Sequence, residues 1–417
     1  MKRSADILSI TDQLLLLAVR ESKTKAEDAR RLLEQADVDW DGLSRDSGQN
    51  RVDSFVADLL AHPSLQKHLA PDRAADWRAR GMLGVFRMEI FHKRIGDLGS
   101  ALQNAGVDML AYKGIDFQLR CYSSEQPRGF SDIDILVAPR DVDSAAACLE
   151  MAGYYPADGR KTLDYYRRFH LHAVYRHTRH PWPIELHWAL DAPLGTGFDS
   201  AALILGAAES SSELGPGVLR PRSIDALALM CTHLEKHLAH APWLPDASAR
   251  LKAVIMGSGL IWLLDIVRWM RRHAKATSAD DVLERMRELG AERSYILALR
   301  LAADLEPQAL PAWALHAALT SRRVPLIARL IYPDLSRGRA ATAAGEKRRT
   351  VLYAPRPQWG FRPIRVLQVL LPAGRVPVES TVPIRTRVHR AARRTCLIGA
   401  NAWALARTHA HNRRGRR

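Results

Sequence analysis

Apolar and polar positions follow two different periods along the chain. In the stretch Asp132-Ile133-Asp134-Ile135-Leu136-Val137, apolar residues alternate with acids. Alternation with a period of two is typical of a β-strand with one buried face, whereas apolar residues three or four apart predict an amphipathic helix. Such runs predict strands over 109–112 and 132–137 and a hairpin of 170–176 with 184–189. Helical spacing between them predicts helices over 115–122 and 142–151. We therefore expect a small mixed sheet with helices against one face.

Helical spacing dominates on both sides of this region. Residues 7–82 predict a short helical domain, and 86–105 predict one more helix, which Gly106 ends. Four further helices are expected over 224–240, 260–273, 279–289 and 293–305. Beyond residue 332, repeated prolines exclude long regular elements until Val388, after which a final helix to about residue 410 is expected. The predicted fold class is α+β, a small mixed-sheet core flanked by N-terminal and C-terminal helical domains and followed by a basic tail.

Charge and proline content divide the chain further. We expect an N-terminal helical region over 1–94, the core over 95–195, a helical domain over 196–345 and a proline-containing extension over 346–417. That extension holds 17 Lys or Arg against two acids, so it carries nearly all of the net charge of +16. No aromatic residues alternate with its final arginines to stack on bases, so a solvated extension is favoured over nucleic-acid binding through the tail.

Cysteine usage and hydropathy bear on the compartment. The four cysteines are scattered without a Cys-x-x-Cys pair, which predicts neither a zinc site nor a disulfide framework and fits a reducing cytoplasm. Asp6 and Asp12 interrupt the first apolar segment, which argues against a signal peptide. The longest apolar run is broken by Asp265, so no transmembrane segment is predicted. We expect a cytoplasmic protein.

Three acids are candidate metal ligands. Asp132 and Asp134 point to the same side of their predicted strand, where two carboxylates resist ionising together unless a divalent cation such as Mg²⁺ lies between them. A solvated edge strand can carry the same pair. Glu185 lies between Ile184 and Leu186 in a second alternating run and is a candidate third carboxylate. His187 shares its face.

A strand that ends at Lys113-Gly114 and continues as a helix is a candidate phosphate turn. The first N–H groups of a helix have no partner within it and favour an anion, and Lys113 would add a positive charge. Arg128 and Ser131 precede the acidic strand and complete the set of candidate nucleotide-binding residues. An Arg beside acids is often only part of a salt bridge.

These motifs together resemble the nucleotidyltransferase superfamily typified by DNA polymerase beta. More narrowly, their order is similar to a bacterial family of largely uncharacterised nucleotidyltransferases, over about residues 94–270. The order comprises Tyr112-Lys113-Gly114, Arg128, Ser131 to Val137, Gly153-Tyr154, Ile184 to Trp188, His233 with His237, and Trp262-Leu263-Leu264-Asp265-Ile266. The chain departs from the superfamily in having Lys113-Gly114 where Gly-Gly or Gly-Ser is usual, and in a longer interval from Gly114 to Asp132.

The resemblance implies transfer of a nucleoside monophosphate from an NTP to an acceptor hydroxyl or phosphate, with release of pyrophosphate. We expect Asp132, Asp134 and Glu185 to hold two Mg²⁺ ions, or Mn²⁺, and Lys113 with Arg128 to bind the triphosphate. His187 and Lys236 are candidates for the acceptor side of the site. The acceptor is left open among a small molecule, a sugar phosphate, a peptide and a protein.

Other interpretations are weighed against this one. A non-catalytic member would bind a nucleotide or a partner protein, although three intact carboxylates argue against a decayed site. A template-independent polymerase or tRNA-directed enzyme is favoured by the basic tail and disfavoured by the near-neutral remainder. His233 and His237 have metal-ligand spacing on a helix, but no third ligand is evident and zinc is not favoured.

Overall fold

The computed structural model describes residues 7–35, 37–159, 162–190, 201–238, 241, 244 and 246–320. The chain divides into two compact units, of which the first comprises residues 1–160, 172–190 and 198–340. In the second unit, residues 161–171, 191–197 and 341–417, the described element is helix α9 (Leu163–Phe169). The basic tail and the helix expected near its end lie outside the described residues. Everything that follows concerns the first unit.

A single mixed sheet of seven strands lies at the centre of the described core, in the order β3-β4-β5-β2-β1-β7-β6. The strands are β1 (Met109–Ala111), β2 (Ile133–Leu136), β3 (Tyr154–Pro156), β4 (His172–His177), β5 (Ile184–His187), β6 (Glu209–Ser210) and β7 (Val218–Arg220). β2 pairs in parallel with β5 and antiparallel with β1, and β4 and β5 form the predicted antiparallel pair. The four strands expected from alternation are confirmed. β3, β6 and β7 were not expected, because two or three residues are too few to show a period.

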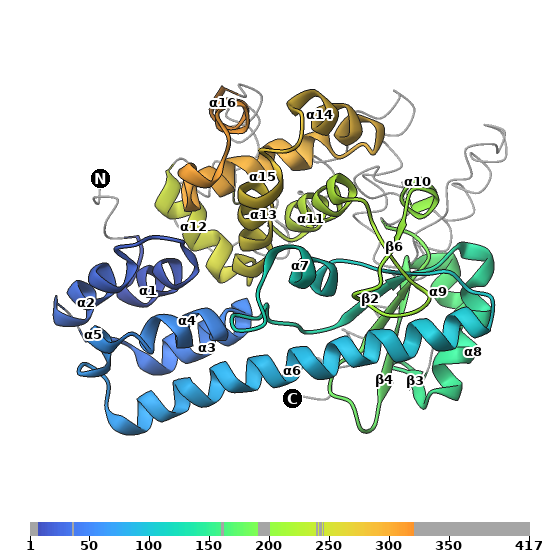
Figure 1. The fold of residues 1–417 in the computed structure, drawn as a ribbon, viewed down its shortest axis with the longest axis horizontal. Helices are drawn as coiled ribbons and strands as arrows, with labels where there is room; N and C mark the ends of the chain where they lie inside the picture. Colours follow the sequence, from blue (N-terminus) through green and yellow to red (C-terminus); the bar gives the residue numbers. More distant parts are fainter. Residues whose placement is uncertain are drawn as a thin grey trace, which may run out of the picture. The chain divides into compact units, whose positions relative to one another are not determined.

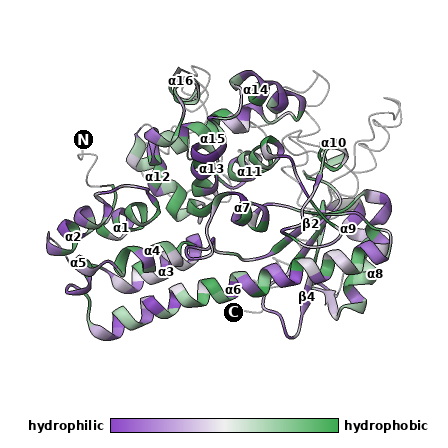
Figure 2. Cartoon of the chain, viewed as in Figure 1, coloured by the Kyte–Doolittle hydropathy of each residue, from purple (hydrophilic) through white to green (hydrophobic). Residues whose placement is uncertain are grey.

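One face of the sheet is covered by α6 (Pro71–Asn104) and α8 (Val142–Met151), and Figure 1 shows α6 as the long helix beside the sheet. Apolar and polar bands alternate along α6 (Figure 2), and its buried residues Phe91, Ile95, Leu98 and Leu102 recur at helical spacing. Phe91 stacks on Phe130 with ring centroids 4.2 Å apart. The helix predicted to begin near residue 86 is thus the second half of a 34-residue helix that starts at Pro71. α6 runs across residue 94, where a domain boundary is predicted.

The opposite face of the sheet packs on helices from the C-terminal half of the unit, so the expectation of helices against one face alone is wrong. Leu110, Tyr112 and Leu136 belong to one buried cluster with residues of these helices. The helices are α11 (Ser223–Leu238), α12 (Ala247–Met256), α13 (Leu260–His273), α14 (Ala279–Glu288), α15 (Glu292–Leu305) and α16 (Ala312–Thr320). The helices expected over 260–273, 279–289 and 293–305 match α13, α14 and α15 to within one residue. Since side chains alternate along β2, Asp132 and Asp134 lie on the same face as Leu136.

The remaining elements are short helices. They are α1 (Ile10–Val19), α2 (Lys25–Gln35), α3 (Trp40–Asn50), α4 (Asp53–Leu60), α5 (Pro63–Gln66), α7 (Gly114–Cys121) and α10 (Ala201–Gly206). α1 begins at a capping box in which Ser9 and Asp12 exchange hydrogen bonds. Among the described residues, no single helix combines the length and apolar composition needed to cross a membrane, although α12 and α13, bent by 120° at their junction, pass that test as a pair.

Candidate active site

The three predicted carboxylates lie together on the face of the sheet that packs toward the C-terminal helices. Parallel pairing of β2 with β5 makes Asp134 and Glu185 direct register partners. Asp132 precedes β2 and faces the same way as Asp134, two residues away. Asp134 is buried, with 5% of its surface exposed, while Asp132 and Glu185 are half-buried. A sheet of this order therefore brings acids from two distant segments to one place.

Asp134 is held by two basic side chains. Lys113 Nζ donates to its Oδ1 at 2.5 Å, and His187 Nε2 lies 3.1 Å from the same oxygen. Burial alone would raise the pKa of Asp134, but Lys113 and His187 outweigh it and hold that pKa well below its usual range. In return, Asp134 and Glu185 overcome the burial of Lys113 and raise the pKa of its ammonium. Both groups therefore stay charged.

Glu185 lies beside a pair of histidines. His187 Nε2 lies 3.2 Å from Glu185 Oε2, and His172 Nε2 lies 4.0 Å from Oε1. Burial and His187 lower the pKa of His172 to about 4, so this imidazole is neutral at pH 7. His172 was missed in the sequence, although it is the register partner of His187 in the predicted hairpin. Only the register of that hairpin, which alternation leaves open, could have indicated it.

Ionisation is least favourable at Asp132 among the three acids. Burial and the nearby charge of Asp134 raise the pKa of Asp132 to about 6, against the pull of Lys113. A carboxylate whose pKa is raised in the folded chain binds its proton more tightly there than in the unfolded chain. Its ionised form therefore lowers the stability of the fold. A bound divalent cation would remove this cost, so the three acids fit a cation of oxygen-preferring character such as Mg²⁺.

We expect Asp132→Asn to stabilise the metal-free protein. The cost of ionising Asp132 begins as pH rises through the ordinary value of 3.8 and is complete above about 6. At pH 8 the variant should gain about 2–3 kcal/mol in free energy of unfolding, and at pH 5 about half of that. Urea unfolding in EDTA at both pH values measures it. Equal free energies of unfolding of the two proteins at pH 8 would show that ionised Asp132 does not destabilise the fold.

The Lys113-Gly114 turn joins β1 to α7 as the sequence predicts. Lys113 adopts φ 55° and ψ −118°, a conformation that glycine adopts freely and other residues rarely do. A Cβ added at Gly114 would lie 2.9 Å from Arg128 Nη1 and 3.1 Å from the Phe130 ring, so the backbone approaches closely here. The unusual conformation of Lys113 directs the chain into α7 while its side chain reaches Asp134.

Comparing Lys113→Gly with Lys113→Ala isolates the backbone contribution of this turn. Both variants lack the ammonium group, so the loss of its contact with Asp134 cancels in the comparison. We expect the Gly variant to be about 1 kcal/mol more stable, although Gly usually costs unfolded-chain entropy relative to Ala. Urea unfolding midpoints measure the difference. A more stable Ala variant would mean that the turn relaxes to negative φ.

Arg128 is not directed at the acids. Its Nε and Nη2 bind both oxygens of Asp265 on α13, at 2.9 and 2.7 Å, and both residues are buried. Tyr122 donates its hydroxyl to Asp265 at 2.6 Å, and the Arg128 backbone N–H bonds Gln118 Oε1. The guanidinium expected to contact the triphosphate is thus engaged in a bidentate pair. In this structure Arg128 fixes the loop that leads into β2.

Arg51, at the end of α3, lies beside the acids and was not predicted. Its Nη1 is 3.4 Å from Ser131 Oγ, and its Nη2 donates to the Ser258 carbonyl at 2.9 Å. Its buried Nε has no hydrogen-bond partner among the described residues. Burial and the charge of Arg128 lower the pKa of Arg51 to about 10, which still leaves it charged at pH 7. An anion would pair well with this guanidinium, and no local motif around residue 51 indicates it.

Three residues on helices that belong to the family resemblance, His233, His237 and Trp262, pack their rings together. The rings of His233 and His237 on α11 lie 4.5 and 4.9 Å from that of Trp262 on α13, and the Arg51 guanidinium lies 4.7 Å over the same Trp262 ring. Neither histidine belongs to the group of three described side chains whose ligand atoms are close enough to hold a metal ion, which is His172 with Glu185 and His187. Lys236 lies on α11 with an exposed side chain.

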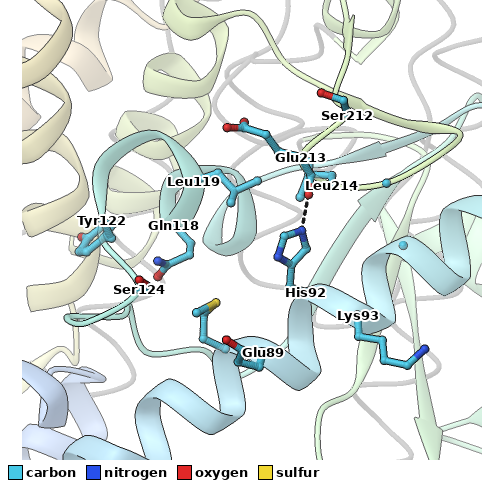
Figure 3. A pocket seen from close by; sticks show the side chains of 13 residues that line it. Glu89, His92, Lys93, Gln118, Leu119, Tyr122, Ser124, Ser212, Glu213 and Leu214 are labelled. Carbon is cyan, nitrogen blue, oxygen red and sulfur yellow. Dashed lines mark hydrogen bonds between the residues drawn. The ribbon is translucent and has the colours of Figure 1, made fainter.

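Two of the cavities lined by described residues bear on the site. The larger, about 640 Å³, lies between α6, α7 and the loop from β6 to β7, and Figure 3 shows Gln118 and His92 at its wall. None of the predicted site residues lines it. The smaller, about 490 Å³, is lined by Arg51, Arg128 and Gly129 together with Arg80, Arg87, Phe130 and Trp182. None of the three acids lines it, but Arg51 links its wall to Ser131, the residue before Asp132.

A comparison with protein families adds an independent finding. A profile of the family described as "Uncharacterised nucleotidyltransferase" matches residues 36–306, well over half of the 417-residue chain. The match includes the whole sheet and all of the candidate site residues. A search of the curated proteins finds no match.

Proposed function

The chain belongs to the uncharacterised nucleotidyltransferase family, and on that premise we propose that it transfers a nucleoside monophosphate from an NTP to an acceptor hydroxyl or phosphate. The observation that carries the proposal is the meeting of Asp134 and Glu185 as register partners, with Asp132 on the same face. Structural acids do not usually gather in this way, because mutual repulsion costs stability. The cost is consistent with a site built for a cation and a polyphosphate.

The proposed reaction forms one bond and breaks one. The acceptor oxygen bonds to the α-phosphorus of the NTP, the bond between that phosphorus and the α–β bridging oxygen breaks, and pyrophosphate leaves. The acceptor hydroxyl loses its proton to solvent. Asp132, Asp134 and Glu185 would hold two divalent cations, Mg²⁺ or Mn²⁺, which supply charge neutralisation to the triphosphate and lower the pKa of the acceptor. Positioning and electrostatics account for most of the rate in such a transfer.

Lys113 and Arg51 provide the positive charge that the leaving pyrophosphate needs. In the structure, the Lys113 ammonium donates a hydrogen bond to Asp134 Oδ1. We propose that it turns to the triphosphate when the acids are otherwise neutralised, so that one side chain serves two anions in succession. Arg51, with its unpaired buried Nε among the described residues, is the second phosphate contact. Arg128 is a positioning residue, which acts through the Gly129 loop.

The smaller cavity is the proposed place of the acceptor. Arg51 lines it and contacts Ser131, the residue before Asp132, so an acceptor bound there would have to extend past Arg51 to reach the acids. The cavity wall combines the rings of Phe130 and Trp182 with four arginines and two acids, Asp53 and Asp76. Arg80 pairs with both of these acids, and Arg128 pairs with Asp265. Such a wall suits an acceptor that has a flat or apolar body, with Arg51 and Arg87 placed for an anionic group.

Labelled NTPs test the reaction class. We expect the full chain, given Mg²⁺ or Mn²⁺ and a cell extract, to transfer label from the α-position of an NTP to an acceptor and to release label from the γ-position as pyrophosphate. Transfer of γ-label would identify a kinase instead. If no acceptor becomes labelled while the protein still binds NTP, the non-catalytic alternative replaces the proposal.

A further inference from the structure

We infer that His172, His187 and Glu185 form a binding site for a divalent transition-metal ion. Each of the three offers one ligand atom, and these atoms all lie within 4.8 Å of one another. Asp134 Oδ1, 3.1 Å from His187 Nε2, is available as a fourth donor. The inference deepens the proposed function and rests on it for the role of the ion, because two of these residues are also proposed cation ligands.

The fold brings the two imidazoles together with little freedom. His172 on β4 and His187 on β5 are direct register partners, and their ring centroids are 4.7 Å apart. Both Nδ1 atoms are buried and have no hydrogen-bond partner among the described residues, while both Nε2 atoms lie near the Glu185 carboxylate. The edge of each ring that carries Nε2 therefore faces the carboxylates. Two imidazoles and a carboxylate that converge in this way leave coordination positions open.

The donor set distinguishes between metals. Mg²⁺ prefers oxygen ligands and retains several waters, whereas imidazole nitrogen suits zinc and other transition metals. The pair Asp132 and Asp134 offers oxygen alone, and the group around Glu185 offers two nitrogens with oxygen. The site therefore combines an oxygen position with a nitrogen-rich one, and the two would take different ions.

Metal titration in the presence of excess Mg²⁺ tests the inference. We expect the metal-free full chain to bind Zn²⁺ or Co²⁺ by calorimetry, and Co²⁺ to give a visible absorption band. His172→Gln should weaken that binding at least about tenfold. The matched control is His177→Gln, five residues along the same strand and on the opposite face of the sheet, where its ring contacts Tyr154. Unchanged affinity in His172→Gln, or full displacement by Mg²⁺, would overturn the inference.

A second measurement covers the case in which His172→Gln does not fold. Diethyl pyrocarbonate modifies neutral imidazoles, and mass spectrometry locates the modified residues in the wild-type chain. Zn²⁺ should protect His172, whose side chain is 28% exposed, and Mg²⁺ at the same concentration should not. Equal modification with and without Zn²⁺ would contradict the site. Neither readout uses NTP, so loss of the metal site and loss of transferase activity are observed separately.

Discussion

Asp134→Asn is expected to lower nucleotide transfer about a thousandfold, because it removes the charge at the centre of the proposed cation site while keeping the shape of the side chain. Asn retains an oxygen that accepts a hydrogen bond, so the contact to Lys113 Nζ survives in part. The rate of α-label transfer under saturating NTP measures the effect. Wild-type activity in this variant would refute the assignment of the acid.

Alanine is the wrong replacement at this position. Asp134 is the partner of the Lys113 ammonium, which is mostly buried, with 16% of its side chain exposed. Removing the whole carboxylate would leave that cation without its partner and would destabilise the fold. A loss of activity in Asp134→Ala would therefore mix chemistry with unfolding.

Two further proteins separate these effects. The double variant Lys113→Met with Asp134→Asn removes both charges and should recover much of the stability while remaining inactive. Asp97→Asn, at an exposed ion pair with Lys93 on α6, controls for the loss of one carboxylate and should be fully active. A double variant with restored activity would show that Asp134 acts only by holding Lys113.

Local periodicity explains how far the site could be predicted. Alternation assigns Asp132 and Asp134 to one face of a strand, and Glu185 with His187 to one face of another. These assignments need only the nearest neighbours in sequence, and the strands observed at β2 and β5 agree with them. That β5 is the parallel neighbour of β2 depends on crossover connections, for which no short segment carries a signal. For that reason, only the family resemblance predicted that Glu185 would meet Asp132 and Asp134.

Partners distant in sequence account for what the pattern missed. A charged residue seen alone does not reveal whether it will meet an opposite charge or a ligand. Arg128 looks like a phosphate contact until α13 brings Asp265 to it across 137 residues of chain. Arg51 looks like an ordinary helix-end arginine until the Gly129 loop and Ser131 pack beside it. Both are products of tertiary packing, which local sequence does not encode.

The buried pair of Arg128 with Asp265 gives the largest expected effect on stability. Asp265 is fully buried and accepts from Arg128 through both oxygens and from the Tyr122 hydroxyl. Asp265→Ala leaves the guanidinium, 5% exposed, without its counter-charge. The expected loss is about 3–5 kcal/mol in free energy of unfolding, against less than about 0.5 kcal/mol for Asp97→Asn. Urea unfolding of both variants measures it.

A volume-conserving replacement decides whether the pair serves stability or position. Arg128→Met with Asp265→Leu removes both charges, and such replacements are often neutral or stabilising. It also removes the donors from Arg128 to Asp265 and to the Gly129 carbonyl, which fix the loop before Asp132. We expect near-wild-type unfolding together with a transfer rate at least about tenfold lower, since small displacements at a polyphosphate site are costly. Full activity in the stable double variant would make the pair a fold element alone. A stable and slow protein would show that α13 holds the loop in the position that the carboxylates require.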